Sequence, residues 1–293
     1  MPLKRRPAGS LLVFFALTFA ISEPCFIAGA RLSSGLAPGA PLGPAIWTLI
    51  TLGTFAPGIV AVALSAYTGG RSSIVELLAT LVRWQAPVRA YVFAAGYMIA
   101  IKLAAAAAHR AMLGTWPRWG ETPLPLLLAA TVFSTVVGGQ AGEELGWRGY
   151  ALPKLAARVG LGPASVVLGV IWASWHLPLF YLHGADTYQQ SFPVYALQVT
   201  AISVAIAWPW WRTGGSLLLT MLMHAAINNT KDIVPAALGQ PPGVFTLGAS
   251  PMSWLGAALL WAVAIACLAN MRGRRRPLES GQTGALLPAA GQR

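Results

Sequence analysis

Charged residues are scarce in this chain, and acidic residues are the scarcest of them. The 293 residues include 20 Lys and Arg but only 8 Asp and Glu, so 10% of the sequence is charged while 56% is hydrophobic. A soluble domain carries about a quarter charged residues. This composition excludes an ordinary soluble globular protein and predicts an integral membrane protein.

Cysteine and internal repetition are also nearly absent. The two cysteines, Cys25 and Cys267, lie in apolar runs near opposite ends of the chain, which excludes a disulfide framework or a cysteine-based zinc cluster. No repeat with a period of 20–50 residues is visible, so a solenoid is excluded. Short alternating strands, the pattern of a transmembrane β-barrel, are missing too.

What is present is a series of long apolar runs, several of which approach the about 20 residues that a transmembrane helix needs. The runs predict an all-α, polytopic transmembrane helix bundle. The first run follows a basic N-terminus and is too long for the core of a cleaved signal peptide, so it is predicted to be a membrane span. Eight spans are expected, at about residues 10–30, 43–67, 90–108, 123–143, 161–182, 192–211, 214–230 and 253–271.

These spans predict a single transmembrane domain over residues 10–271. A basic segment, residues 1–9, precedes it, and residues 272–293 form a basic tail rich in small residues, which is predicted to be disordered.

The net charge of +12 would suit a nucleic-acid partner, but its distribution does not. With eight spans, 15 of the Lys and Arg fall on one side, four fall on the other, and Lys102 lies within a span. This bias follows the positive-inside rule. It predicts that both termini are cytoplasmic, that membrane lipids are the charged partner, and that the protein binds no nucleic acid.

Two of the few acids are neighbours at the end of an apolar run. Glu143 and Glu144 follow the predicted fourth span, where a charge costs about 2.5–3.5 kcal/mol on insertion scales and therefore marks a function. Two further apolar runs end in polar groups, Trp172 to His176 and His224 to Asn228. These three segments are the candidate functional site.

Helical geometry indicates which residues of these segments share a helix face. His224 and Asn228 lie four residues apart and share one helix face, as Glu144 and Arg148 do if the helix continues through residue 146. Adjacent side chains diverge by about 100°, so the two glutamates cannot easily do the same job. We expect one to face the bundle interior and the other to pair with Arg148.

The residue types indicate hydrolysis of an amide or ester. A carboxylate in a low-dielectric site suits a general base near neutral pH. One histidine beside it can hold a water molecule or share its proton, and a second histidine with an asparagine amide can donate hydrogen bonds to an oxyanion. The same atoms could instead coordinate a divalent metal such as zinc, which activates bound water.

The predicted span boundaries place Glu143 and His176 at different levels along their helices. Glu143 falls near the cytoplasmic end of its span, whereas His176 lies about 20 Å along the next helix at 1.5 Å per residue. Straight helices with these boundaries would not bring the two residues level. Either the fourth helix extends through Arg148 and is tilted, or the boundaries are displaced by a turn or more.

The three segments resemble the CPBP family of intramembrane proteases, which includes CAAX proteases and bacteriocin-processing (Abi) enzymes. The family motifs EExxxR, FxxxH and HxxxN correspond to residues 143–148, 172–176 and 224–228. Trp172 stands where the family usually has Phe, and the other motif positions match. The resemblance covers about residues 70–232.

The resemblance implies roles for the matched residues. Glu143 would be the catalytic base and His176 would help to activate the water. His224 and Asn228 would stabilise the oxyanion, while Glu144 and Arg148 would orient the base. In a metal-dependent mechanism Glu143, His176 and His224 would be the ligands. Both mechanisms stay open, because the stronger metalloprotease signal, an H-E-x-x-H helix, is missing.

The resulting hypothesis is an intramembrane endopeptidase of a bacterial cytoplasmic membrane, acting on a peptide or a lipidated protein. The alternative is a non-catalytic membrane scaffold or immunity protein of the same fold. A small-solute transporter ranks last, because no paired inverted halves are visible.

Overall fold

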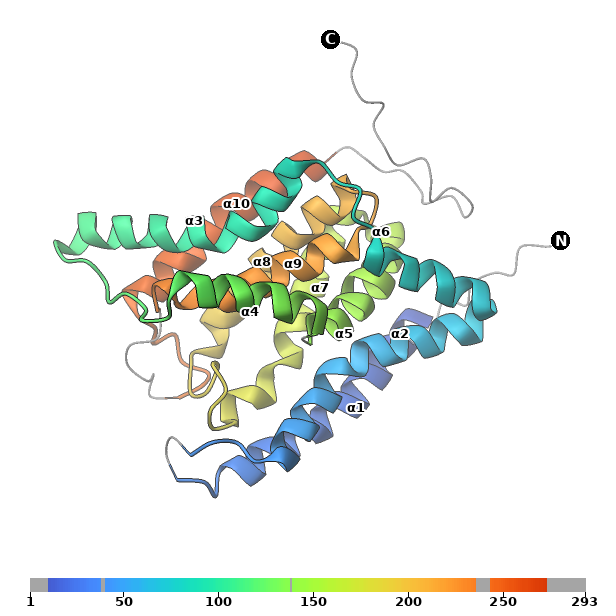
Figure 1. The fold of residues 1–293 in the computed structure, drawn as a ribbon, viewed down its shortest axis with the longest axis horizontal. Coiled ribbons are helices and arrows are strands. Elements are labelled where there is room, and N and C mark those ends of the chain that lie inside the picture. The colour runs from blue at the N-terminus through green and yellow to red at the C-terminus, as the bar shows by residue number, and fades with distance from the viewer. Residues whose placement is uncertain (1–9, 38–39, 138, 236–242, 273–293) are drawn as a thin grey trace, which may run out of the picture.

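The computed structural model describes residues 10–37, 40–137, 139–235 and 243–272. The predicted basic N-terminus and nearly all of the predicted tail lie outside the described residues. Within the described part of the chain every regular element is a helix (Figure 1). The α-helices are α1 Ser10–Ser33, α2 Pro44–Ala79, α3 Val88–Leu113, α4 Leu124–Val137, α5 Gln140–Glu144, α6 Leu152–Val159, α7 Leu161–Trp175, α8 Phe192–Arg212, α9 Leu217–Thr230 and α10 Pro251–Met271.

Shorter helical segments connect these helices. The most important is η2, a π-helix over Leu145–Ala151 that joins α5 to α6 without a break. Three 3-10 segments complete the set: η1 Thr80–Val82, η3 Leu177–Tyr181 and η4 Lys231–Ile233.

The predicted polytopic helix bundle is confirmed, but the count of eight spans is not reproduced. Six helices among the described residues are long and apolar enough to cross a membrane, and a seventh span results if the bent pair α4 and α5–α6 is counted as one. The predicted span at 214–230 corresponds to α9, which has 14 residues. At 1.5 Å per residue it is only about 21 Å long, which is short for a bilayer crossing.

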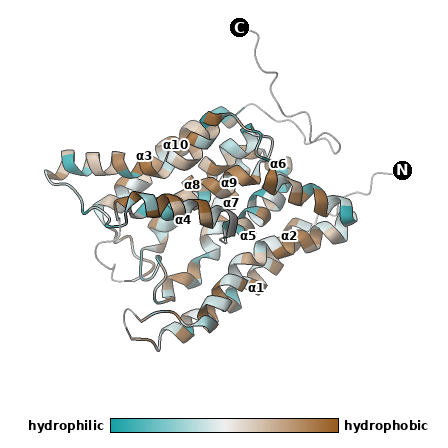
Figure 2. Ribbon diagram, viewed as in Figure 1, coloured by the Kyte–Doolittle hydropathy of each residue, from teal (hydrophilic) through white to brown (hydrophobic). Residues whose placement is uncertain are grey.

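Hydrophobic side chains cover the outside of the bundle as well as its core. On α4, the large side chains of Leu124, Leu126, Leu128, Val132 and Phe133 are all exposed. Figure 2 shows hydrophobic stretches on the helices at the outside of the bundle. Exposed apolar patches of this extent are uncommon on soluble proteins, so the surface as well as the composition identifies an integral membrane protein.

The helices are arranged around α7, α8 and α9. The α1–α2 pair lies along one side of the bundle and the α3–α10 pair along the other (Figure 1). Among the candidate spans α8 is the most buried and α1 the least. The predicted site segments therefore lie on elements at or next to the interior: α5 and η2, α7, and α9.

Helix starts follow local capping rules. Ser191, Ser216 and Ser250 precede α8, α9 and α10, and each hydroxyl accepts a hydrogen bond from the backbone N–H three residues later. A serine at this position satisfies one of the donors that the first helical turn leaves unpaired.

Glu143 and His176 lie at the same level because the helix that carries the glutamates continues beyond its predicted end at residue 143. The predicted span 123–143 is divided: α4 ends at Val137, and a second helical segment bent by 47° runs from Gln140 to Val159. The chain then turns at Gly160, whose φ of 85° suits glycine, and returns as α7. Glu143 and His176 lie at nearly equal sequence distances from this turn, so the two arms of the hairpin bring them to one level.

Glycines allow α2 to approach α5 and η2 backbone to backbone. A Cβ atom added to Gly146 would lie 2.6 Å from the carbonyl carbon of Pro57, and one added to Gly58 would lie 2.7 Å from the carbonyl oxygen of Gly142. Small residues of this kind commonly form helix contacts in membranes. The contact holds the glutamate-bearing segment against α2.

Candidate active site

The segment that carries the glutamates changes from an α-helix to a π-helix at Leu145. π-Helical turns are rare and occur frequently at functional sites. The helix continues through Gly146, so Glu144 and Arg148 lie on one face, as their spacing predicts.

Glu144 is held by a guanidinium and an imidazole. Arg148 Nη1 donates to Glu144 Oε1 at 2.8 Å, and both side chains have 0% exposure. His224 Nδ1 on α9 lies 3.0 Å from the same oxygen. An ionised carboxylate only accepts hydrogen bonds, so Nδ1 of His224 carries the proton. These contacts tie α9 to the glutamate segment.

Glu143 has a different environment from its neighbour. Its Oε2 accepts a hydrogen bond of 2.8 Å from the indole Nε1–H of Trp172 on α7. Its other oxygen, Oε1, makes no hydrogen bond to the described residues, and the residue keeps 7% exposure where Glu144 has none. Oε2 of Glu144 is also unpaired but fully buried, so Glu143 is the glutamate whose unpaired oxygen belongs to a residue that retains slight exposure.

His176 is fixed by the main chain of the preceding turn. Its Nδ1 lies 2.8 Å from the carbonyl oxygen of Trp172. A carbonyl oxygen only accepts, so Nδ1 carries the proton and Nε2 presents a lone pair in the neutral ring. The ring packs edge-on against Trp175 at 4.8 Å and Tyr195 at 5.6 Å between centroids.

The structure brings five of the six predicted site residues together and leaves one outside. Asn228 lies one turn beyond the buried His224 but is exposed, and it has no hydrogen bond to the described residues. Its role in the site stays a prediction. The next residue, Asn229, donates to Ser134 Oγ at 2.9 Å and so joins α9 to α4.

Several polar atoms of the cluster remain buried without a hydrogen-bond partner among the described residues. They are Glu144 Oε2, Arg148 Nε and Nη2, and Gln140 Oε1 one turn before the glutamates. Buried polar groups are normally satisfied by protein, water or ligand. This arrangement can therefore hold water or a polar part of a substrate.

The donor set does not form a metal site in this arrangement. No group of three or more His, Cys, Asp and Glu side chains in the described ranges lies close enough to hold a metal ion. Zinc usually takes three or four such ligands at about 2.0–2.3 Å, so these residues as they lie do not provide a zinc site.

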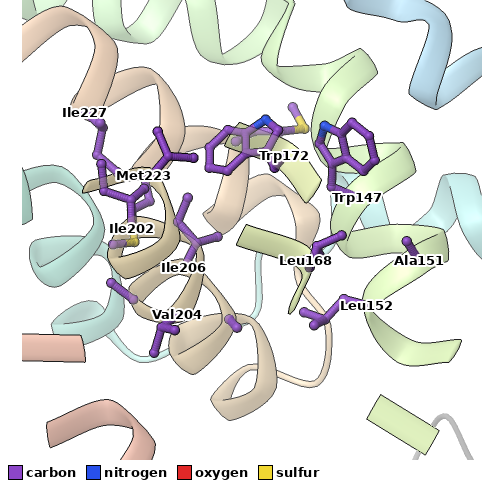
Figure 3. Close-up of a cluster of buried hydrophobic side chains, with 14 of the residues drawn as sticks. Trp147, Ala151, Leu152, Leu168, Trp172, Ile202, Val204, Ile206, Met223 and Ile227 are labelled. Carbon is purple, nitrogen blue, oxygen red and sulfur yellow. The ribbon is translucent and has the colours of Figure 1, made fainter. Parts of the chain in front are cut away.

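Trp172 is the site residue that sequence reasoning missed. It marks the start of the second motif, but its indole N–H contact with Glu143 was not predicted. The available signal was chemical: tryptophan stands at a position where phenylalanine is usual, and tryptophan adds a buried donor. Figure 3 shows it with Trp147 and Met223 in one cluster of buried side chains.

A cavity of about 740 Å³ lies beyond the end of α7. Its lining includes Arg31, Phe180 and His183 but none of the predicted site residues. Phe180 packs against Tyr195 at 5.1 Å, and Tyr195 in turn packs against His176. Two aromatic rings thus connect the cavity to the histidine.

Comparison with known proteins agrees with the geometry. Residues 121–230, which hold all three motifs, match the family described as "Type II CAAX prenyl endopeptidase Rce1-like". A curated relative, "CAAX prenyl protease 2" of Methanococcus maripaludis, is 32% identical over 115 residues, which is 37% of this chain and 39% of the relative. The chain thus spans about two fifths of the length of the curated relative it matches. The resemblance predicted from the motifs is confirmed.

Replacing Arg148 by Met should destabilise the protein by about 3–5 kcal/mol, because Glu144 would keep a buried charge without its main partner. The matched control is Arg118→Met, which removes an exposed partner of Glu121 and should cost at most about 1 kcal/mol. Thermal unfolding in detergent measures both. Equal melting temperatures for the two variants would contradict the structural role of the pair.

Proposed function

We propose that this protein, whose residues 121–230 match the family described as type II CAAX prenyl endopeptidase Rce1-like, is an intramembrane endopeptidase. It would hydrolyse a peptide bond of a membrane-associated substrate with a water molecule activated by Glu143. The observation that carries the proposal is the unequal treatment of two adjacent buried glutamates. Glu144 is fully buried and held by both Arg148 and His224, while Glu143 meets one neutral donor, Trp172, and keeps 7% exposure.

Charge balance supports this division. A buried cluster with a net charge is costly, and the pair of glutamates is offset by Arg148 and one further proton. That proton can reside on His224, which leaves Glu143 ionised as a base, or on Glu143 itself. Glu143 can therefore be either ionised or protonated without a change in the net charge of the cluster. This suits a residue that acts first as a general base and later as a general acid.

The reaction then follows from the available atoms. Glu143 Oε1 takes a proton from a water molecule that also donates to Nε2 of His176, and the hydroxide attacks the carbonyl carbon. Protonated His224 donates from Nε2 to the developing oxyanion, where Asn228 is the predicted second donor. Glu143 returns its proton to the leaving amine as the C–N bond breaks, so the water is divided between the two products.

The substrate we propose is a peptide segment or a lipidated protein that reaches the site from the membrane. The curated relative carries the name CAAX prenyl protease, so a prenylated C-terminal peptide is the natural first probe. Membrane lipids surround the bundle. We further propose a bacterial cytoplasmic membrane, with the basic segments at both ends of the chain on the cytoplasmic side.

We propose the metal-free form of the mechanism. No group of three or more His, Cys, Asp and Glu side chains in the described ranges lies close enough to hold a metal ion, which supports this form. The general-base form uses the side chains where they lie.

Replacing Glu143 by Gln should lower turnover by about 10²–10⁴-fold, the usual contribution of a general base. The measurement uses purified protein in detergent and a farnesylated, fluorescence-quenched peptide with a C-terminal CAAX sequence. Glu121→Gln is the matched control, because Glu121 is 84% exposed and distant in the fold, and it should keep wild-type turnover.

Equal turnover in wild type and Glu143→Gln would reject Glu143 as the base. A non-catalytic scaffold or immunity protein predicts a different pattern, in which no peptide is cleaved and Glu143→Gln still restores the phenotype of a deletion strain. Complementation with this variant therefore separates the two functions.

Metal removal should leave the activity unchanged. We expect that preincubation with phenanthroline or EDTA does not lower the cleavage rate, since no step needs a metal, and that elemental analysis of the purified protein finds no stoichiometric zinc. A loss of activity that added zinc restores would instead establish the metal-dependent mechanism.

A further inference from the structure

Trp172 contacts four residues of the proposed site. Its indole N–H donates to Glu143, and its carbonyl oxygen accepts from His176. The guanidinium carbon of Arg148 lies 4.3 Å from its ring centroid. The ring of His224 meets it edge-on at 5.2 Å between centroids. Among the described residues, Trp172 is the one that makes hydrogen bonds or ring contacts to all four.

The indole N–H is the part of Trp172 that packing alone does not explain. The buried Trp147 and Trp175 and the half-buried Trp208 all have buried ring nitrogens without a hydrogen-bond partner among the described residues. The fold therefore tolerates buried indole N–H groups that donate no hydrogen bond to the described residues. At Trp172 the same group is directed at a carboxylate oxygen, and the side chain is only 3% exposed.

We propose that Trp172 is a positioning residue, which orients the Glu143 carboxylate by holding Oε2 so that Oε1 is presented to the water. The proposal rests on the proposed hydrolase function and adds to it a residue that does not touch the substrate. A carboxylate on a Glu side chain can otherwise rotate about its last torsion, which is broad. One fixed oxygen removes that freedom before the substrate arrives.

The same residue links the base to the histidine that shares its water. The Trp172 carbonyl sets the proton on Nδ1 of His176, and the Trp172 indole sets the orientation of Glu143. Glu143 and His176, the two residues that would bind the water, are thus both oriented by one residue of α7. A phenylalanine at this position would keep the ring contacts with Arg148 and His224 but would lose the hold on Glu143.

The first test is Trp172→Phe, with Trp147→Phe as the matched control. Trp147 is 0% exposed and lacks an N–H partner in the described structure, and it packs against Phe14 and Trp175. Cleavage of the farnesylated CAAX peptide by Trp172→Phe should show kcat lowered by about 10- to 100-fold, the scale of a misplaced catalytic group. KM should stay unchanged, and Trp147→Phe should keep the wild-type kcat. Unchanged kcat in Trp172→Phe would overturn the proposal.

A second variant guards against a folding defect. Benzothienylalanine, a tryptophan analogue in which sulfur replaces the ring N–H, preserves the shape and the aromatic contacts of the side chain. Placed at position 172 it should reproduce the fall in kcat with a wild-type melting temperature. Wild-type kcat for the analogue would assign the effect of phenylalanine to lost volume, and so would reject the positioning role.

A third measurement does not depend on cleavage. In protein labelled with 15N at the indole nitrogens, the Trp172 signal is identified by its loss in Trp172→Phe. Replacing Glu143 by Ala should move this signal upfield, because the hydrogen bond to the carboxylate is lost, whereas Glu121→Ala should not move it. A signal insensitive to Glu143→Ala would show that the contact does not exist. A sensitive signal together with no cleavage of any peptide would reject the hydrolase and retain the contact.

Discussion

The buried ion pair between Glu144 and Arg148 is the interaction on which the rest of the site depends. Both side chains are withdrawn from solvent, and neither charge would be tolerated there alone. The pair requires that the helix continue from α5 through η2, and His224 on α9 completes it. The continuous α5–η2 segment and α9, joined by a contact between residues 80 apart in sequence, are thereby held together, and Glu143 is positioned beside them.

The site assigns different tasks to similar groups. Two adjacent glutamates diverge, so one is held by the Arg148 guanidinium and the His224 imidazole and the other meets an indole N–H. Two histidines are each fixed through Nδ1, one by a carboxylate and one by a carbonyl, which leaves both Nε2 atoms free to act. Trp172 lies between these groups and adds a neutral donor where another charge would be expensive.

Much of this could be predicted from the sequence, because it depends on local geometry. The spacing of Glu144 and Arg148 predicts their pairing, and the adjacency of the glutamates predicts their divergence. The features that the sequence did not predict depend on tertiary structure. The division of the fourth span after Val137 lies within one apolar run, and hydrophobicity alone does not reveal a bend. The exposure of Asn228 depends on which neighbour covers the last turns of α9, and the Trp172 contact with Glu143 joins residues 29 apart through the turn at Gly160.

Turnover and thermal unfolding, measured side by side for Glu143→Gln and Glu144→Gln, test the division of roles most directly. The account predicts opposite patterns. Glu143→Gln should unfold near the wild-type temperature and lose turnover, whereas Glu144→Gln should lose about 3–5 kcal/mol of stability because Arg148 is left as an uncompensated charge. If both variants lost turnover and stability to the same extent, the two glutamates would not have separate tasks, and the account would be wrong.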